Sequence, residues 1–285
     1  MNSDKSIRRR GVYLLPNLLT SAALFAGFYS VIAGINGKFE SAAIAIIVAG
    51  FLDGLDGRVA RMTNTQSDFG EQYDSLSDLI SFGLAPALLA FNWSLSSLSE
   101  ISTMVGKLGW LAAFLYMACA ALRLARFNTQ AGIADKRYFQ GLASPAAAGT
   151  LVFTIWFFVD NGIAGETVRW LIFIETVVLG ILMFSNVRYY SFKASPGGEK
   201  VPAVWLLLAL LIIVLLALDP PVIGMLLGCI YVLSGLFITI AGRRNWKLKR
   251  GRRAPKEKKV DPEIGSSTLV DKVESEDPHD PGTGN

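Results

Sequence analysis

The sequence contains almost no histidine or cysteine, the residues that most often carry nucleophilic and metal chemistry in proteins. Its single histidine, His279, lies in a polar C-terminal stretch, which excludes histidine catalysis or ligation from the apolar part of the chain. Its two cysteines, Cys119 and Cys229, lie in apolar blocks and form neither a disulfide framework nor a zinc pattern. We interpret both as small hydrophobic residues in helix packing. Chemistry here must use carboxylates, arginine, lysine, hydroxyl groups or the backbone.

Charged residues are also sparse. They make up 18% of the 285 residues against 52% hydrophobic residues, and the mean hydropathy of +0.43 is too high for an ordinary soluble domain. The apolar residues form blocks close to the roughly 20 residues that a helix needs to cross a bilayer. We therefore predict an all-α integral membrane protein, a polytopic helical bundle within residues 1–242. The eight expected spans are residues 11–35, 39–62, 73–95, 106–127, 145–160, 167–186, 200–218 and 222–242.

Basic residues predict how this bundle is oriented. With an even number of spans both termini share one side, and nearly all Lys and Arg fall on that side, whereas Lys38, Lys107 and Arg169 fall on the other. Positive residues collect in the cytoplasm, so we expect a multi-pass cell-membrane protein with both termini cytoplasmic. The first apolar run is long for a secretory signal, and we interpret it as an uncleaved span.

Residues 243–285 differ in composition from the rest of the chain. The stretch is basic up to residue 259 and then acidic and rich in Gly, Pro and Ser, which predicts a disordered cytoplasmic tail. The basic part has two open interpretations: an anchor that fixes topology, or a surface that binds anionic lipid headgroups.

Two pairs of aspartates carry the most specific signal. Asp53 and Asp56 lie three residues apart near the end of the second span, and Asp74 and Asp78 lie four apart at the start of the third. Residues at these spacings share one face of a helix, so a turn near residues 63–72 would make four carboxylates converge at the cytoplasmic end of a hairpin. Such a cluster is unfavourable at membrane depth unless protons or a cation offset the charge. Oxygen ligands suit Mg²⁺ or Mn²⁺, and also Ca²⁺, and four carboxylates can hold two ions that clamp a phosphoryl group.

The neighbouring residues fit a phosphate-containing ligand. Gly57 and Ala60 would let a nucleotide approach the second span closely, and Gly70 would do the same in the turn. Arg61 can neutralise phosphate charge. An ion or proton transporter also uses intramembrane carboxylates, but the clustering at one face favours an enzyme over a transport pathway.

This segment resembles the CDP-alcohol phosphotransferase family. The family's motif, D-x2-D-G-x2-A-R-x8-G-x3-D-x3-D, is complete between Asp53 and Asp78. The resemblance implies a six-helix core, to which this chain adds two C-terminal spans, and a homodimer. It also implies that Asp53, Asp56 and Asp74 bind metal, that Asp78 is the general base and also touches metal, and that Gly57, Ala60, Arg61 and Gly70 line the CDP site. Asn17 and Thr20, in a stretch similar to the family's PNxLT, would face the nucleotide.

Two further stretches are similar to bacterial and archaeal phosphatidylserine synthases. They are RLARFN at 123–128 and FQGLASPAAA at 139–148, where Ala143 replaces an expected proline. This similarity implies that Arg123, Arg126, Asn128 and Ser144 bind the acceptor or a phosphate. Alternatively, the two arginines only fix the membrane topology of the chain and bind no substrate.

The implied partners are CDP-diacylglycerol, L-serine and membrane lipids, with no nucleic acid. The implied reaction is direct attack of the serine hydroxyl on the β-phosphorus, with Asp78 accepting its proton and CMP leaving. Glycerol 3-phosphate, inositol phosphate and choline remain alternative acceptors. For a phosphorylated acceptor, a basic pocket could be supplied by Arg123, Arg126, Lys136 and Arg137.

Overall fold

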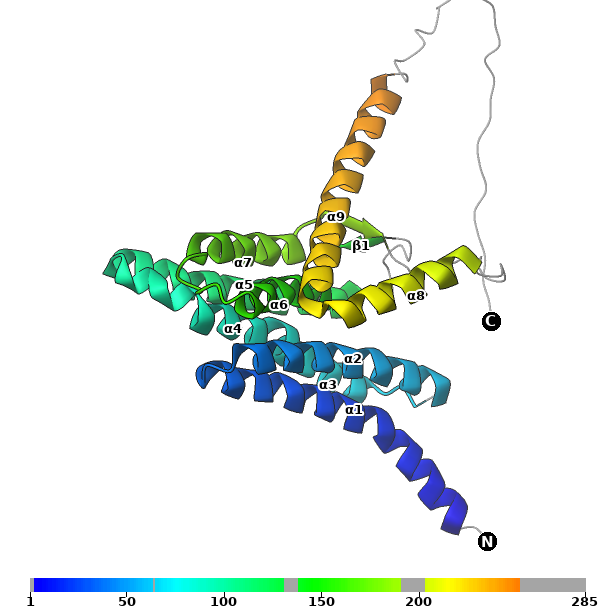
Figure 1. Cartoon of the computed structure of the whole chain (residues 1–285). Coiled ribbons are helices and arrows are strands. Elements are labelled where there is room, and N and C mark those ends of the chain that lie inside the picture. The colour runs from blue at the N-terminus through cyan, green and yellow to red at the C-terminus, as the bar shows by residue number, and fades with distance from the viewer. Residues whose placement is uncertain (1–2, 64, 131–137, 191–202, 252–285) are drawn as a thin grey trace, which may run out of the picture. The chain divides into compact units, whose positions relative to one another are not determined.

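The computed structural model describes residues 3–63, 65–130, 138–190 and 203–251, which are mostly helical (Figure 1). The α-helices are α1 (Ser3–Ile35), α2 (Phe39–Thr63), α3 (Asp68–Asp78), α4 (Ala85–Trp93), α5 (Thr103–Gln130), α6 (Ser144–Asp160), α7 (Arg169–Phe184), α8 (Ala203–Leu218) and α9 (Pro220–Gly251). A π-helix, η1 (Leu79–Leu84), joins α3 to α4, and a 3₁₀-helix, η2 (Leu95–Glu100), follows α4. Helix thus covers most of each predicted apolar segment. Some residues used in the predictions lie outside the described residues, namely 200–202, Lys136 and Arg137.

Several of these helices have the length and composition of membrane spans. Within the described ranges, four helical stretches are long and apolar enough to cross a bilayer, and α6 is apolar but shorter. The four are Leu15–Ile35, Asp68–Trp93, Thr103–Thr129 and Pro220–Thr239. The chain is therefore a helical membrane protein, while the count of eight spans stays a prediction.

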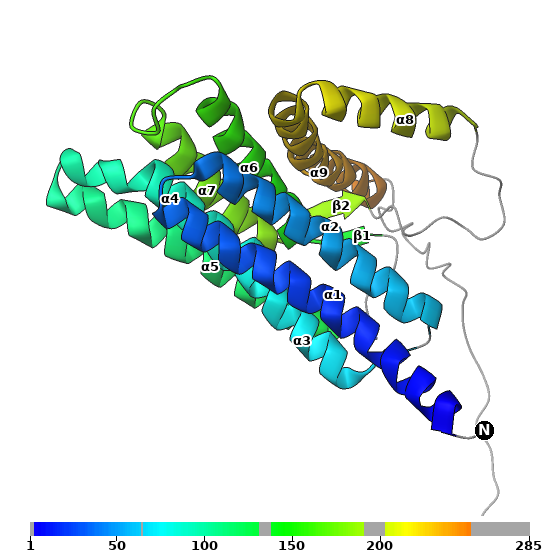
Figure 2. The same cartoon turned by 60° about the horizontal axis from the view of Figure 1, so that its bottom comes forward.

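Helix α1 organises the part of the bundle that carries the aspartates. It lies beside α2 and also contacts α3, η1 and α4 (Figures 1 and 2). The fully buried Ala42 and Ala43 keep the helices close. A Cβ atom on Gly27 would lie only 2.6 Å from the Ser81 hydroxyl oxygen, so glycine is required there. The predicted α2–α3 hairpin is therefore bridged by α1.

The π-helix η1 begins directly after Asp78, a feature that the sequence did not predict. At its end the Ala85 amide donates to the Ile80 carbonyl oxygen, five residues back. Pro86 follows, and proline has no amide to donate to the carbonyl four residues before it. A helix tolerates an extra residue at such a break, and single π turns recur at functional sites.

Two short strands depart from the all-α expectation. β1 (Tyr138–Gln140) pairs antiparallel with β2 (Arg188–Tyr190), with Phe139 opposite Tyr189. Gly141 ends β1 with a φ of +83°, and a Cβ atom there would collide with the Met183 carbonyl oxygen. A left-handed backbone in such a tight space requires glycine. The strands bring the start of α6 next to the end of α7.

Helix α9 packs on the bundle through glycines. Gly224 faces the Phe153 ring, and a Cβ atom on Gly228 would lie 2.6 Å from the Thr150 hydroxyl oxygen. Glycines four residues apart allow helices to approach closely. Helix α9 continues past residue 242, the expected end of the last span, because Lys and Arg are good helix formers. Residues 252–285, most of the predicted tail, lie outside the described residues.

Candidate active site

Three of the four motif aspartates form a cluster that can hold a metal ion. Asp53 and Asp56 come from α2 and Asp74 from α3, and one carboxylate oxygen of each lies within 4.8 Å of the others. Carboxylate oxygens are the donors that Mg²⁺ and Mn²⁺ prefer. The residues lie on one face of each helix, as the spacing predicted.

Helix α1 fixes one of these carboxylates. The Thr20 hydroxyl donates to Asp56 Oδ2 at 2.6 Å, and both residues are almost fully buried, with 4% and 5% of their surface exposed. A hydrogen bond from outside the ligand set orients a metal-binding carboxylate. The sequence predicted that Thr20 faces the nucleotide, whereas the structure shows it in contact with Asp56.

Asp78 lies one turn after Asp74, beside the cluster. Its carboxylate interacts electrostatically with Asp53, Asp74 and Arg123. The Oδ1 atoms of Asp74 and Asp78 are both buried, and neither has a hydrogen-bond partner among the described residues. A buried carboxylate oxygen without a partner is costly unless a cation compensates it. The cluster therefore fits a divalent metal held by Asp53, Asp56 and Asp74, with Asp78 adjacent.

The predicted nucleotide-binding residues lie on the three helices that surround the cluster. A Cβ atom on Gly57 would be 3.5 Å from an Arg61 guanidinium nitrogen, so the two residues are neighbours on α2. A Cβ atom on Gly70 would be 3.4 Å from Asn17 Oδ1, which places α1 and α3 side by side there. Ala60 is half-buried on α2.

Arg123, on α5, interacts electrostatically with Asp78. Its guanidinium donates to the Ser144 hydroxyl at 2.7 Å, and Ser144 is fully buried at the start of α6. Electrostatic interactions also reach Asp78 and, on α9, Tyr231. A guanidinium has five N–H donors, and the Ser144 bond is the one that the described residues supply. The remaining donors can bind an anion.

Arg126 has a different environment from Arg123. Its guanidinium donates to the carbonyl oxygens of Phe184 at 2.9 Å and Gln140 at 3.0 Å, and it lies 5.1 Å from the centre of the Phe184 ring. These contacts join α5 to the end of α7 and to β1, which supports a structural role. Asn128 donates to the Ser75 hydroxyl at 3.0 Å and joins α5 to α3.

Sequence reasoning missed the polar contacts that fix α3 and η1 on α1. The Ser77 and Ser81 hydroxyls donate to backbone carbonyl oxygens of α1, that of Ser77 to Thr20 at 3.3 Å. The Ser21 and Tyr73 hydroxyls lie 2.8 Å apart. Serines four residues apart in an apolar helix were the available signal.

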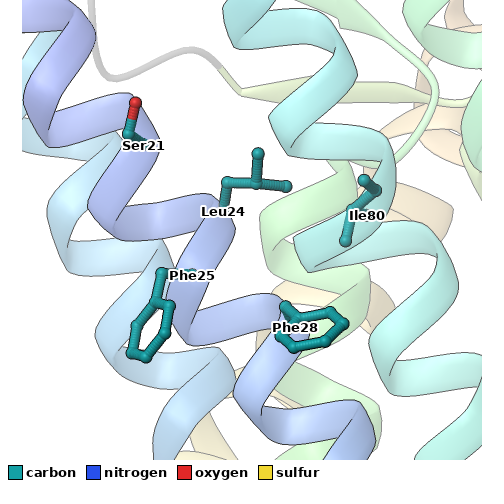
Figure 3. Close-up of a pocket in the computed structure, with 5 residues that line it drawn as sticks. All are labelled: Ser21, Leu24, Phe25, Phe28 and Ile80. Atoms are coloured by element: carbon teal, nitrogen blue, oxygen red, sulfur yellow. The ribbon is translucent and has the colours of Figure 1, made fainter.

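A shallow apolar pocket lies beside these contacts. Four residues of α1 and Ile80 of η1 line it, and Figure 3 shows their side chains around it. The α1 residues are Ser21, Leu24, Phe25 and Phe28. Its volume of about 390 Å³ and its lining suit a hydrocarbon chain.

Together these features define a class: a helical membrane protein with a carboxylate cluster that fits a metal ion and an arginine in electrostatic contact with Asp78. A family model described as CDP-alcohol phosphatidyltransferase matches residues 13–182. The chain therefore belongs to the CDP-alcohol phosphatidyltransferase family, whose members are metal-dependent. The matched range ends within α7, so α8 and α9 lie beyond it.

Curated relatives narrow the comparison. The chain is 38% identical over 194 residues to the CDP-diacylglycerol–serine O-phosphatidyltransferase of Helicobacter pylori, covering 67% of this chain and 77% of that protein. It is 34% identical over 187 residues to the enzyme of that name from Mycobacterium tuberculosis, covering 63% and 62%. It is 35% identical over 191 residues to the archaetidylserine synthase of Methanothermobacter thermautotrophicus, covering 66% and 74%.

Proposed function

We propose that this protein transfers a phosphatidyl group from CDP-diacylglycerol to the hydroxyl of L-serine, forming phosphatidylserine and CMP. The carrying observation is the cluster of Asp53, Asp56 and Asp74, with Asp78 in electrostatic contact with it and with Gly57 and Arg61 further along the same helix as Asp53 and Asp56. The names of the relatives from bacteria and an archaeon support serine as the acceptor.

The donor side binds the nucleotide. Asp53, Asp56 and Asp74 would hold Mg²⁺ or Mn²⁺, with Ca²⁺ as the alternative, and we propose two ions, which supply charge neutralisation for the pyrophosphate and the departing CMP. Gly57 and Gly70 let the pyrophosphate approach the backbone, and Arg61 pairs with its charge.

The acceptor side binds serine. Arg123 has N–H donors left after its bond to Ser144, and a guanidinium binds a carboxylate through two parallel hydrogen bonds. The electrostatic contact between Arg123 and Asp78 then brings the serine hydroxyl close to a carboxylate base.

Asp78 activates the acceptor. It takes the hydroxyl proton of serine while the serine oxygen forms a bond to the β-phosphorus of CDP-diacylglycerol. The bond from this phosphorus to the CMP oxygen breaks, CMP leaves with the electron pair, and Asp78 later releases the proton to water. A positioned base contributes about 10²–10⁴ in rate. Direct attack needs no covalent phospho-enzyme.

The membrane arrangement is part of the proposal. The acyl chains stay in the bilayer, and the pocket of Leu24, Phe25 and Phe28 offers one of them an apolar surface near Thr20. We propose eight spans, six in the family core and two added, with both termini and the active site on the cytoplasmic side. We also propose a homodimer and a cytoplasmic tail after residue 242.

A CMP-release assay tests the proposal. The purified protein receives CDP-diacylglycerol and Mn²⁺, with serine, glycerol 3-phosphate, inositol phosphate or choline added in turn, and the lipid product is identified by mass spectrometry. We expect CMP release and phosphatidylserine formation only when serine is the added acceptor. Release with another acceptor would reassign the substrate, and ion flux in liposomes without CMP release would favour a transporter.

Isotope exchange tests the order of events. Labelled CMP should not enter CDP-diacylglycerol when serine is omitted. Exchange under these conditions would show a phospho-enzyme and contradict direct attack.

A further inference from the structure

Helix α9 lies beyond the family match but reaches the acceptor side of the site. Gly224 and Gly228 seat it against α6, and Gly235 seats it against the Tyr189 ring. Tyr231 lies three residues after Gly228, a spacing that places both on one helix face. The glycine contacts therefore turn Tyr231 toward the bundle.

Tyr231 lies close enough to Arg123 for electrostatic interaction. It is half-buried, and its ring packs on Tyr189 with 5.3 Å between ring centres and 34° between planes. Tyr231 therefore brings a phenol to the side of the site where Arg123 would bind the substrate carboxylate.

Tyr189 holds Tyr231 in this position. It is fully buried in β2, and its hydroxyl donates to the Val232 carbonyl oxygen at 3.5 Å, one residue after Tyr231. Its ring lies directly against Gly235, and a side chain at position 235 would collide with the ring. Contacts with Tyr189 of β2 thus fix the position of Tyr231 on α9.

The chemistry of serine indicates what Tyr231 contacts. The carboxylate and ammonium of serine share one carbon, so a site that binds the carboxylate at Arg123 must place the ammonium nearby. Arg123 repels an ammonium, and Asp78 is assigned to the serine hydroxyl, so the ammonium needs another electron-rich partner. A phenol supplies one through its oxygen and through its ring face.

We propose that Tyr231 of α9 is an acceptor-binding residue that contacts the ammonium of serine beside Arg123. This inference rests on the proposed function, because it assumes serine as the acceptor. It also assigns α9 a role in substrate selection.

Steady-state kinetics of Tyr231→Phe and Tyr231→Ala test the inference. Loss of one hydrogen bond predicts a rise of about 3–10-fold in the serine KM for the phenylalanine variant, and a larger rise for alanine. The KM for CDP-diacylglycerol should stay unchanged. Tyr29→Phe, at an exposed tyrosine of α1, and Leu233→Ala, at an exposed position of α9, are matched controls.

An acceptor without the ammonium separates recognition from a merely structural role. 3-Hydroxypropanoate keeps the carboxylate and hydroxyl of serine. The ratio of kcat/KM for serine to that for 3-hydroxypropanoate should fall in both Tyr231 variants, and it should not fall when Tyr29 or Leu233 is changed. If Tyr231→Ala does not fold, Tyr231→Phe carries the test.

Three outcomes would overturn the inference. They are an unchanged serine KM in Tyr231→Phe, an equal loss for both acceptors, and an equal rise in both substrate KM values. Failure of the proposed function looks different, because the wild-type protein itself would then release no CMP with serine, and both proposals would fall together.

Discussion

The two sides of the site are built in different ways. The acidic side takes its carboxylates from α2 and α3, which are adjacent in the chain, and Thr20 of α1 buttresses it. The basic side takes Arg123 from α5 and Ser144 from α6, and Tyr231 approaches from α9. The acidic side is therefore local in sequence, and the basic side exists only after the bundle is assembled.

This difference separates two tasks. In the proposed function the acidic side deals with the CDP group, and its parts have fixed spacing within one segment. The basic side is proposed to bind the acceptor alcohol, and residues from separate helices can vary independently. Substitutions on the acidic side should abolish the chemistry, whereas those on the basic side should change which alcohol reacts and how tightly it binds.

The largest effect should follow removal of a metal-binding carboxylate. Asp56→Ala should lower activity by about 10⁴-fold, because metal stabilisation supplies several kcal/mol and each 1.36 kcal/mol is tenfold in rate. Mn²⁺ binding, measured by electron paramagnetic resonance, should weaken in parallel. Asp68→Ala, at an exposed carboxylate of α3, is the control. Normal Mn²⁺ binding in Asp56→Ala would show that the cluster is not a metal site.

Loss of the base should have the next largest effect. Asp78→Asn should lower kcat by about 10³-fold, because it removes a positioned proton acceptor. CDP-diacylglycerol binding should persist, since Asp53, Asp56 and Asp74 remain. Titration with a labelled nucleotide and single-turnover kinetics measure the two quantities, with Glu71→Gln as control. Activity near the wild-type level would refute the base assignment.

The Thr20 hydroxyl should matter less. Thr20→Val removes the donor to Asp56 without changing the side-chain shape greatly, and loss of such a support weakens metal affinity by about 10–100-fold. Thr20→Ser keeps the hydroxyl and should restore most of the affinity. Activity measured against Mn²⁺ concentration distinguishes them. A valine variant with an unchanged metal requirement would contradict this role.

The smallest effect on turnover is expected at Arg126. Arg126→Ala should destabilise the fold by about 2–3 kcal/mol, because charged hydrogen bonds to the Phe184 and Gln140 carbonyl oxygens are lost. The folded fraction should keep its serine KM. Thermal unfolding in detergent measures the first quantity, and Lys107→Ala is the control for loss of positive charge. A raised serine KM would instead place Arg126 in the acceptor site.

The sequence predicted those features whose cause lies in one segment. Apolar runs predicted helices, and the spacing of the four motif aspartates predicted that their carboxylates converge, as they do for Asp53, Asp56 and Asp74. The strands were missed because β1 and β2 have only three residues each and exist by pairing across distant loops. Pattern reasoning has no access to such pairs.

The two arginines show the same limit. Arg123 and Arg126 lie three residues apart and carry the same charge, so the sequence offered no basis for assigning them different roles. In the folded chain Arg126 meets carbonyl oxygens of α7 and β1, while Arg123 faces Ser144 and Asp78. Tyr231 was missed because the significance of its position depends on where the α9 glycines place it.

The single π turn between Asp78 and Pro86 has a geometric consequence. Each residue of an α-helix advances the chain by about 100° around the axis, so one inserted residue sets the rotational phase between α3 and the apolar α4. With that residue removed, Asp74 and Asp78 would swing by about a quarter of a turn relative to α4. The π turn thus fixes the direction in which the aspartates of α3 point while α4 keeps its own packing in the bundle.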